Sequence, residues 1–588
     1  MSFPRAEPPR WCFRLRLEAT GPGCRSVARA SPVCRRARPC PVAWEQVTRH
    51  GPPDVDNPTT CEVPMTPTAS HRAATLRRPD LWAVLTAAIA ILVAPAFASS
   101  GALDKRAQDL IGEHHLLGST IGVSAIDVQT GRTLISLDAH QPMIPASNQK
   151  LLSSGVALAL LGPDHVFRTE VLLWGDRLVV RGSGDPAFGD PALLGTADPQ
   201  MSVEDLLERI ITAVERSGVR RFTELVIDDR VFDRDLAHPS WPDEQLNRWY
   251  CAEVSGLNFH TNVLSIYPRP APDGPGTPPT FSLEPRADWI EVRNRARTVG
   301  AGQNTPWVAR RPASNDFTLF GDVRTPAQVP VRVSIHNPSM FFGSLLAERL
   351  RARGIVIGPD RPLTHDASVR LAERDEPIQP DRVLVVVTTL LHDVLRRCNA
   401  DSYNLYAEAL IKLAGHALTG DSGSWESGAA AVRMVLGDRL GPDHASSVSI
   451  ADGSGMSRDN AISPATMAAW LRVVRQDQRL APHFIASLPM PSEGTLRSRF
   501  RDAELRNVVL AKSGTLRGVR CLSGYIVHPE TGRTVAFSIL CNDLRDSNQE
   551  RNARHYHESI VLRLDRWLSE NPGELRTRAH ADEPAMGG

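Results

Sequence analysis

The first regular pattern along the chain is a pair of strand-like apolar runs between Thr120 and Pro142, joined at Thr130-Gly131. Such a pair predicts a β-hairpin. The stretch that begins at Met143 then places apolar side chains, from Leu151 to Leu160, at helical spacing, and Gly162-Pro163 follows them. A helix is therefore expected there, with its end at the glycine.

The middle of the chain, from about residue 174 to 380, has a different pattern. Short apolar runs with strand character alternate with many prolines and glycines, and residues 201–218 carry a helical pattern. From about residue 384 to 478 the spacing indicates helices. Strand-like runs return at 505–543, and a final helix is expected over 552–570. This order predicts a fold in which the first and last pieces share one sheet around a β-rich insertion.

The first 64 residues have no apolar period and are rich in Arg, Pro and Cys. We interpret them as a disordered or misassigned leader. A metal site is not expected in this segment, because Cys34 and Cys40 lack the second pair that such a site needs. From Met65 a basic segment precedes 18 uncharged apolar residues, Leu81–Ala98, which end in a small-x-small cleavage pattern. Residues 65–98 are therefore expected to be a signal peptide or an uncleaved membrane anchor, with Met65 as the true start. Either interpretation predicts an exported protein, in the periplasm or cell envelope.

The charge composition argues against a nucleic-acid-binding function. The 67 Lys and Arg residues balance 66 Asp and Glu residues, which leaves a net charge of +1 and no basic field for nucleic acid. Nearly all of these cations are arginines, because lysine occurs only at positions 105, 150, 412 and 512. A position that keeps lysine in such a chain is a candidate for chemistry that arginine cannot perform.

Ser147 and Lys150 form the one S-x-x-K of the chain, at the start of the helix expected before Gly162. A spacing of three places both side chains on one helix face. A serine hydroxyl needs an adjacent base to become a nucleophile, and a neutral lysine amine can be that base, whereas arginine keeps its proton. Burial, a helix N-terminus or a second cation would lower the pKa of the lysine. The alternative is a helix-capping serine beside a surface lysine.

Two further groups combine hydroxyls with polar or cationic side chains. Ser402 could relay a proton and Asn404 could orient a carbonyl; the alternative for Ser402 is a helix cap. The segment Lys512–Thr515 (KSGT) ends a predicted strand, and a cation beside hydroxyls there suits a carboxylate. Gly514 leaves room for a ligand to approach the backbone closely. The alternative for this segment is a plain strand-end turn.

Taken in order, Ser-x-x-Lys, Ser-x-Asn and Lys-Ser-Gly resemble the motifs of penicillin-binding proteins and serine β-lactamases. The gap of 255 residues from Ser147 to Ser402 is too long for a β-lactamase. It is similar to that of the class C low-molecular-mass penicillin-binding proteins, the D-alanyl-D-alanine carboxypeptidases/endopeptidases of peptidase family S13 (the penicillin-binding protein 4 type). The segments PASNQKLL, LVVRGSGDPAF, AEVSGLNFHTNVL, SYNLYAEALIK, ADGSGMSRDN and LAKSGTLRGVRCLSGY also look like this family, so the resemblance covers about residues 102–570. Ser513 departs from the pattern, since the family usually has Thr there, but the hydroxyl is kept.

The resemblance implies an acyl-transfer mechanism. Ser147 would attack the carbonyl of a D-Ala-D-Ala bond, and Lys150 would take its proton. Ser402 would pass a proton to the leaving D-Ala, while Asn404 would hold the substrate amide. The backbone N–H groups of Ser147 and Thr515 would form the oxyanion hole. This assignment implies a serine hydrolase that needs no cofactor and no metal.

Substrate contacts follow from the same resemblance. Lys512, Ser513 and Thr515 would bind the terminal carboxylate, and Lys512 would help to keep Lys150 neutral by like-charge repulsion. Asp243 and Tyr250 are candidates for recognising the stem-peptide side chain; the alternative for both is loop packing. The implied partners are peptidoglycan stem peptides and, as inhibitors, β-lactam antibiotics. No contact with a membrane is expected apart from the signal or anchor segment.

The implied architecture is the serine β-lactamase/DD-peptidase fold of class α+β. It has a mainly antiparallel five-stranded sheet flanked by helices, with two β-rich domains inserted between the first and second motifs. The expected transpeptidase-like domain occupies 99–172 and 383–570. The insertion occupies 173–382, with one domain nested at about 195–270, and 571–588 is expected to be a disordered tail.

Two other functions compete with the DD-peptidase. A β-lactamase would need a deacylating glutamate, and Glu504 and Asn507 have a suitable spacing but stand too close to Lys512, with Glu504 only eight residues before it. A non-catalytic peptidoglycan-binding or β-lactam-binding protein would not need every motif residue to be present.

Two pairs outside the motifs give structural expectations. Cys521 and Cys541 flank a predicted hairpin almost symmetrically, so a cross-strand disulfide is one possibility and two packed thiols the alternative. Glu408 and Lys412 stand four apart on a predicted helix, which favours an ion pair over a part in the chemistry.

Overall fold

The computed structural model describes residues 101–358 and 368–573. The expected leader at 1–64, the expected signal or anchor at 65–98 and most of the expected tail at 571–588 lie outside the described residues. Within the described ranges, no helix combines the length and the apolar character that crossing a bilayer requires.

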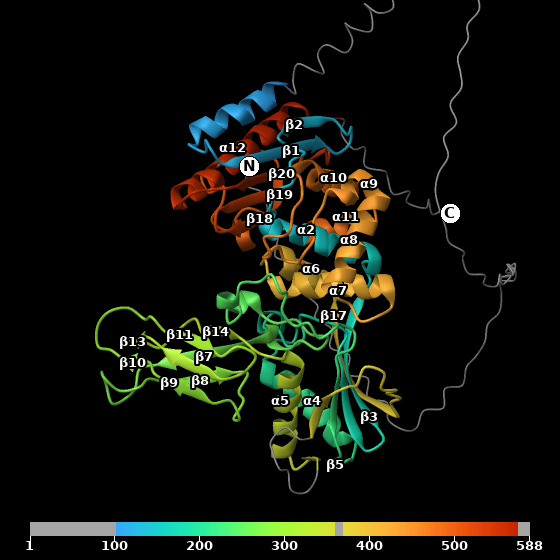
Figure 1. The fold of residues 1–588 in the computed structure, drawn as a ribbon, viewed down its shortest axis with the longest axis vertical. Helices are drawn as coiled ribbons and strands as arrows, with labels where there is room; N and C mark the ends of the chain where they lie inside the picture. Colours follow the sequence, from blue (N-terminus) through green and yellow to red (C-terminus); the bar gives the residue numbers. More distant parts are fainter. Residues whose placement is uncertain (1–100, 359–367, 574–588) are drawn as a thin grey trace, which may run out of the picture. The chain divides into compact units, whose positions relative to one another are not determined.

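One antiparallel sheet joins the beginning and the end of the described chain (Figure 1). Its strand order is β18-β19-β20-β1-β2, and each neighbouring pair is antiparallel. The pairing of β1 with β20 confirms that the first and last pieces share a sheet, and the pairing of β1 with β2 confirms the hairpin. The five strands are β1 (Thr120–Asp127), β2 (Thr133–Leu137), β18 (Val508–Leu516), β19 (Val519–Val527) and β20 (Thr534–Asn542).

Helices cover both faces of this sheet. α12 (Ser547–Glu570) contacts β19 and β20 and packs apolar side chains against one face. α10 (Pro464–Gln476) contacts β1, β19 and β20 from the other face. Nearly every residue of β19 and β20 is buried as a result. Strands covered on both faces carry continuous apolar runs instead of alternating ones, which is why these sequences show little period-two pattern.

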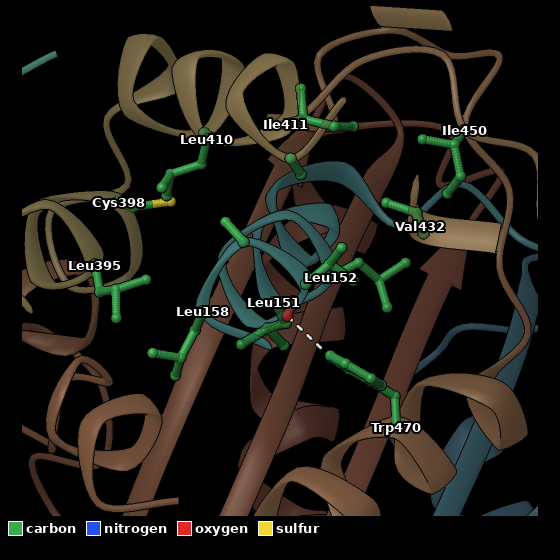
Figure 2. Packing of buried hydrophobic residues seen from close by; sticks show 14 of the residues in the cluster. Leu151, Leu152, Leu158, Leu395, Cys398, Leu410, Ile411, Val432, Ile450 and Trp470 are labelled. Atoms are coloured by element: carbon green, nitrogen blue, oxygen red, sulfur yellow. Dashed lines mark hydrogen bonds between the residues drawn. The ribbon is translucent and has the colours of Figure 1, made fainter. Parts of the chain in front are cut away.

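The helix expected before Gly162 is α2 (Gln149–Leu161), and it lies in the middle of a helical region. Every residue from Gln149 to Leu158 is buried. Figure 2 shows its leucines among side chains from the surrounding helices, and the indole Nε1 of Trp470 donates a hydrogen bond to the carbonyl of Leu151 at 3.0 Å. A helix that is buried on all sides, its few polar residues included, belongs to a core. The other helices here are α6 (Leu391–Asn399), α7 (Asn404–Thr419), α8 (Trp425–Leu440), α9 (Pro442–Ser446) and α11 (Ala481–Ala486).

The β-rich region that follows α2 contains a second five-stranded sheet, in the order β16-β6-β4-β3-β17, and several smaller sheets. It has its own apolar core, in which α4 and α5 pack against the strands. The expected boundaries of the inserted domains stay a prediction. The elements of the region are β3 (Val166–Trp174), β4 (Arg177–Arg181), α3 (Pro191–Leu194), α4 (Val203–Arg216), β5 (Arg221–Phe222), β6 (Leu225–Asp228), β7 (Val263–Arg269), β8 (Thr280–Glu284), β9 (Val292–Asn294), β10 (Arg297–Thr298), β11 (Trp307–Arg310), β12 (Phe317–Phe320), β13 (Asp322–Val323), β14 (Val331–Ser334), α5 (Pro338–Ala352), β15 (Val356–Ile357), β16 (Val369–Leu371) and β17 (Arg382–Leu390).

The expected helix from about residue 384 is wrong at its start. Residues Arg382–Leu390 form β17, which pairs antiparallel with β3, and the helical part begins only at Leu391. The run RVLVVVTTL is rich in β-branched residues, which lose side-chain freedom in a helix and pack well on a sheet. Its apolar residues are continuous, so periodicity alone did not distinguish a buried strand from a buried helix.

The possible disulfide between Cys521 and Cys541 is also wrong, because both thiols are free and buried. The hairpin has the register Val527 opposite Thr534, which places Cys521 opposite Leu540 and Cys541 opposite Arg520. Neighbouring strand residues face opposite sides of a sheet. The Cys521 thiol accordingly lies 3.6 Å from the carbonyl of Ile144, whereas the Cys541 thiol lies 3.4 Å from His557 Nε2 on α12. The alternative of two packed thiols is confirmed.

The packing of α2 predicts a large loss of stability for Trp470→Ala. Trp470 is 1% exposed, and truncating a buried aromatic residue of this size typically lowers the free energy of unfolding by about 3–5 kcal/mol. Trp307→Ala is the matched control, since Trp307 is 48% exposed and we expect a loss of about 1 kcal/mol or less. Urea denaturation of both variants measures the difference. Equal losses in the two variants would contradict the assigned packing.

Candidate active site

The three sequence motifs converge on one cleft of about 780 Å³. Ser147 lies in the 3-10 turn η1 (Ala146–Asn148), immediately before α2. The first turn of α7 and the edge strand β18 bring the other two motifs to the same place. Motif residues that line the cleft are Ser147, Ser402, Asn404, Ser513 and Thr515.

Lys150 is completely buried beside the nucleophile candidate. Its Nζ lies 3.0 Å from Ser147 Oγ, 2.7 Å from Asn404 Oδ1 and 3.0 Å from the carbonyl of Ser454. Burial lowers the pKa of the Lys150 amine from 10.5 to about 8. A neutral amine has two N–H donors and one lone pair. The donors suit the two carbonyl oxygens, and the lone pair can then accept the Ser147 proton.

Glu408 holds the backbone that contacts Lys150. Its carboxylate accepts hydrogen bonds from the backbone N–H groups of Gly453 and Ser454 and from the indole of Trp425, each at 2.8 Å. The carbonyl of Ser454 is the one that Lys150 meets. Burial, followed by the charge of Asp452, raises the pKa of Glu408 to about 7.

The expected Glu408–Lys412 ion pair is wrong. Lys412 Nζ instead lies 2.5 Å from Asp233 Oδ1 and 2.7 Å from the carbonyl of Asp235. Helical spacing brings two side chains to one face, but longer-range partners decide where each of them binds. Sequence reasoning therefore missed the contact of Glu408 with the 453–454 backbone; its only signal was its place one turn after Asn404.

Asn404 and Ser402 line the cleft at the beginning of α7 and just before it. Asn404 begins α7, accepts the bond from Lys150 and donates through Nδ2 to the carbonyl of Tyr250 at 2.8 Å. Ser402 has a φ of +62°, a left-handed conformation that is uncommon for serine and clusters at functional sites. The helix-cap alternative for Ser402 is wrong, because Tyr403 is the N-cap of α7 and no side chain caps it.

The two candidates for stem-peptide recognition separate in space. Tyr250, in the 3-10 turn η3 (Trp249–Cys251), lines the cleft. Asp243, in the turn η2 (Asp243–Gln245), is exposed and is not among the residues that line the cleft.

The third motif divides between the two faces of β18. Lys512 and Gly514 pair with Ser523 and Cys521 of β19, and Lys512 is buried with its Nζ 2.7 Å from its neighbour's carbonyl, that of Ser513. Burial, followed by the charge of Lys150, holds the pKa of Lys512 well below its usual value. A Cβ at Gly514 would lie 2.9 Å from the carbonyl of Pro145. The glycine therefore lets the backbone just before Ser147 pack closely against β18. From the sequence, this space was expected for a ligand.

Several cleft residues had no role assigned from the sequence. The segment ADGSGMSRDN was recognised as similar to the family, but none of its residues was given a role. Within the described residues, no group of three or more His, Cys, Asp or Glu side chains could hold a metal ion. The additional lining residues are Ser240, Pro242, Gln245, Trp249, Asp401, Gly455, Met456, Arg458, Asp459, Thr495, Leu516, Arg517, Arg520 and Glu550.

A comparison with protein families agrees with this geometry. The D-Ala-D-Ala carboxypeptidase 3 (S13) family matches residues 100–564, a range that contains all three motifs. The chain belongs to this family. Among its S13 relatives, the D-alanyl-D-alanine carboxypeptidase of Actinomadura sp. (strain R39) is 32% identical over 449 residues, which cover 73% of this chain and 78% of that protein. The D-alanyl-D-alanine carboxypeptidase DacB of Haemophilus influenzae is 22% identical and covers 74% of this chain and 88% of its own.

Solved structures confirm the expected fold class. The crystal structure of penicillin binding protein 4 (dacB) from Haemophilus influenzae matches with a TM-score of 0.61 at 20% identity, over 77% of this chain and 99% of that chain. The same protein in complex with a novel β-lactam matches with a TM-score of 0.57. The S13 peptidase described here thus has the α+β fold of these penicillin-binding proteins.

The buried base of this S13 peptidase predicts a specific pH dependence. Lys150 accepts a proton only when it is neutral, so the rate of acylation should rise with pH through about 8, the pKa of its amine, and then level off. The rate of benzylpenicillin attachment, followed across this range, measures the profile. Lys150→Met should abolish the reaction, while Lys105→Met, which changes an exposed lysine, should leave it unchanged. A profile that falls as pH rises would contradict a lysine base.

Proposed function

We propose that this S13 peptidase cleaves the terminal D-Ala-D-Ala bond of peptidoglycan stem peptides through an acyl-enzyme on Ser147. One observation carries the proposal: Ser147 Oγ lies 3.0 Å from the amine of a fully buried lysine whose pKa is lowered to about 8. A surface lysine beside a helix-capping serine would be neither buried nor lowered in pKa. The pair therefore has the geometry of a nucleophile and its base.

The proposed reaction uses the contacts already described. Neutral Lys150 takes the hydroxyl proton as Ser147 Oγ bonds to the carbonyl carbon of the penultimate D-Ala. The backbone N–H groups of Ser147 and Thr515 stabilise the oxyanion. Ser402 passes a proton to the nitrogen of the leaving D-Ala, which departs as the C–N bond breaks. Water then attacks the ester, and the free peptide carboxylate and the Ser147 hydroxyl are restored.

Substrate binding divides between the two sides of the cleft. The hydroxyls of Ser513 and Thr515 bind the terminal carboxylate, and Lys512 is buried next to them in the same strand. Asn404 donates to the substrate carbonyl, and Tyr250 contacts the stem peptide. Asp243, exposed outside the cleft lining, would be reached only by a longer part of the substrate.

The same site would also cut cross-links in which D-Ala is bonded to a diamino acid, because the acyl side of that bond is identical. Such a substrate lies outside the cytoplasm, which agrees with a signal peptide or anchor at 65–98. We therefore propose a periplasmic or cell-envelope enzyme that β-lactams inhibit by acylating Ser147.

Two alternatives have less support. A β-lactamase of the considered type needs Glu504 and Asn507 near the ester, yet neither lines the cleft, and Asn507 is buried against Asp565 of α12 with an Nδ2 to Oδ1 distance of 2.9 Å. A non-catalytic binding protein would have no use for a buried lysine whose pKa is lowered to about 8 beside a serine.

Benzylpenicillin tests the proposal directly. We expect the intact mass of the mature protein to gain one long-lived penicilloyl group, because Glu504, the glutamate considered for deacylation, does not line the cleft. Ser147→Ala should show no adduct, whereas Ser446→Ala, a change of an exposed serine in α9, should react like the wild type. An adduct that clears within seconds would favour a β-lactamase, and the absence of any adduct on the wild type would refute the nucleophile assignment.

A further inference from the structure

A second, smaller cavity of about 250 Å³ adjoins the catalytic cleft. It lies on the face of the sheet that α12 covers, since Arg554 and His557 of α12 line it. Thr495, Ser513, Thr515 and Arg520 line both this second cavity and the cleft. A molecule in the cleft can therefore extend into the second cavity past the two hydroxyls of β18.

The second cavity is lined by cations and by no carboxylate. Arg499, Arg520 and Arg554 all contribute to its wall. Arg499 pairs with Glu558, and Arg520 pairs with Glu550 at 2.5 Å, but neither acid lines the second cavity. The Arg554 guanidinium makes no hydrogen bond or ion pair with the described residues that would neutralise it. An anion is the ligand that this wall favours.

Buried polar atoms on the wall also lack partners. Arg520 Nε and Thr495 Oγ1 make no hydrogen bond, although Arg520 is only 8% exposed. His557, 1% exposed, has an unpartnered Nδ1. Burial, followed by the three nearby arginines, holds the pKa of His557 well below its usual value, so its imidazole is neutral. Unpaired buried donors are costly, and a bound acceptor would satisfy them.

The register of β18 shows which part of a substrate reaches this wall. Ser513 is opposite Leu522 and Thr515 is opposite Arg520, so both hydroxyls are on the face that α12 covers. In the proposed function these hydroxyls bind the carboxylate of the residue that leaves. The side chain of that same leaving residue is bonded to the Cα atom next to this carboxylate, so it can enter the second cavity past the two hydroxyls.

We infer that the second cavity binds an anionic side chain, a carboxylate, on the amino acid released by the reaction. This inference rests on the proposed function and adds a specificity to it. Its volume suits a short side chain that ends in a carboxylate, and its arginines would make charge-assisted hydrogen bonds to that group. The enzyme would therefore prefer an acidic leaving residue to the uncharged amide of the same shape.

The test compares two matched N-acylated peptides that differ only in the released residue, D-Ala-D-Glu against D-Ala-D-Gln. We expect kcat/KM to be about tenfold higher for the acid in the wild type, the effect of a hydrogen bond to a charged group. Arg554→Gln should bring the ratio close to 1, and Arg554→Glu should reverse it. Arg551→Gln is the control, because Arg551 lies one turn earlier on α12 and does not line the second cavity.

Benzylpenicillin separates the two hypotheses, because its amine part stays attached after the β-lactam ring opens and carries no acidic side chain. All of these variants should acylate Ser147 at the wild-type rate, which also shows that they are folded. A ratio of 1 in the wild type, or a ratio that Arg554→Gln does not change, would overturn the inference while normal acylation upheld the proposed function. Loss of wild-type acylation would refute the proposed function itself.

Discussion

The burial of Lys150 is the constraint on which the rest of the site depends. Moving an ammonium group out of water is costly, so the packed region around α2 favours the neutral amine. Its three partners, the side chains of Ser147 and Asn404 and the carbonyl of Ser454, come from segments far apart in the sequence. The same packing that excludes water from the base thus fixes its distance to the nucleophile. Arginine would satisfy the charge but not the chemistry, because it would keep its proton.

Two buried carboxylates hold the loop that presents the Ser454 carbonyl. Glu408 binds the backbone N–H groups of residues 453 and 454. Asp452 accepts from the backbone of Gly455 and Ser457 and from the indole of Trp241. Buried carboxylates are tolerated when several donors surround each of them. The loop is therefore fixed from α7 on one side and from the β-rich region on the other, and the pKa values near 8 for Lys150 and near 7 for Glu408 reflect their shared burial.

Sequence patterns predicted the parts of the site that depend on local spacing. Ser147 and Lys150 share a helix start, and their separation of three places them in contact whatever surrounds them. Partners from distant segments were not predictable in this way, as the separate partners of Glu408 and Lys412 show. The possible disulfide was wrong because of the strand register. With Val527 opposite Thr534, Cys521 and Cys541 are one residue out of register, so their side chains face opposite sides of the sheet. β17 failed because a short continuous apolar run fits either a buried strand or a buried helix.

Asn404 connects the β-rich region to the chemistry. Its amide oxygen accepts from Lys150, and its Nδ2 donates to the carbonyl of Tyr250, so the two contacts together fix which end of the amide faces the base. One N–H of Nδ2 remains, and its neighbour is the sulfur of Met456 at 3.8 Å. Sulfur is a weak acceptor, and a substrate carbonyl would be a stronger one. The proposed contact of Asn404 with the substrate therefore requires no movement of Lys150. It uses the second N–H of Nδ2, which has only the Met456 sulfur as its partner.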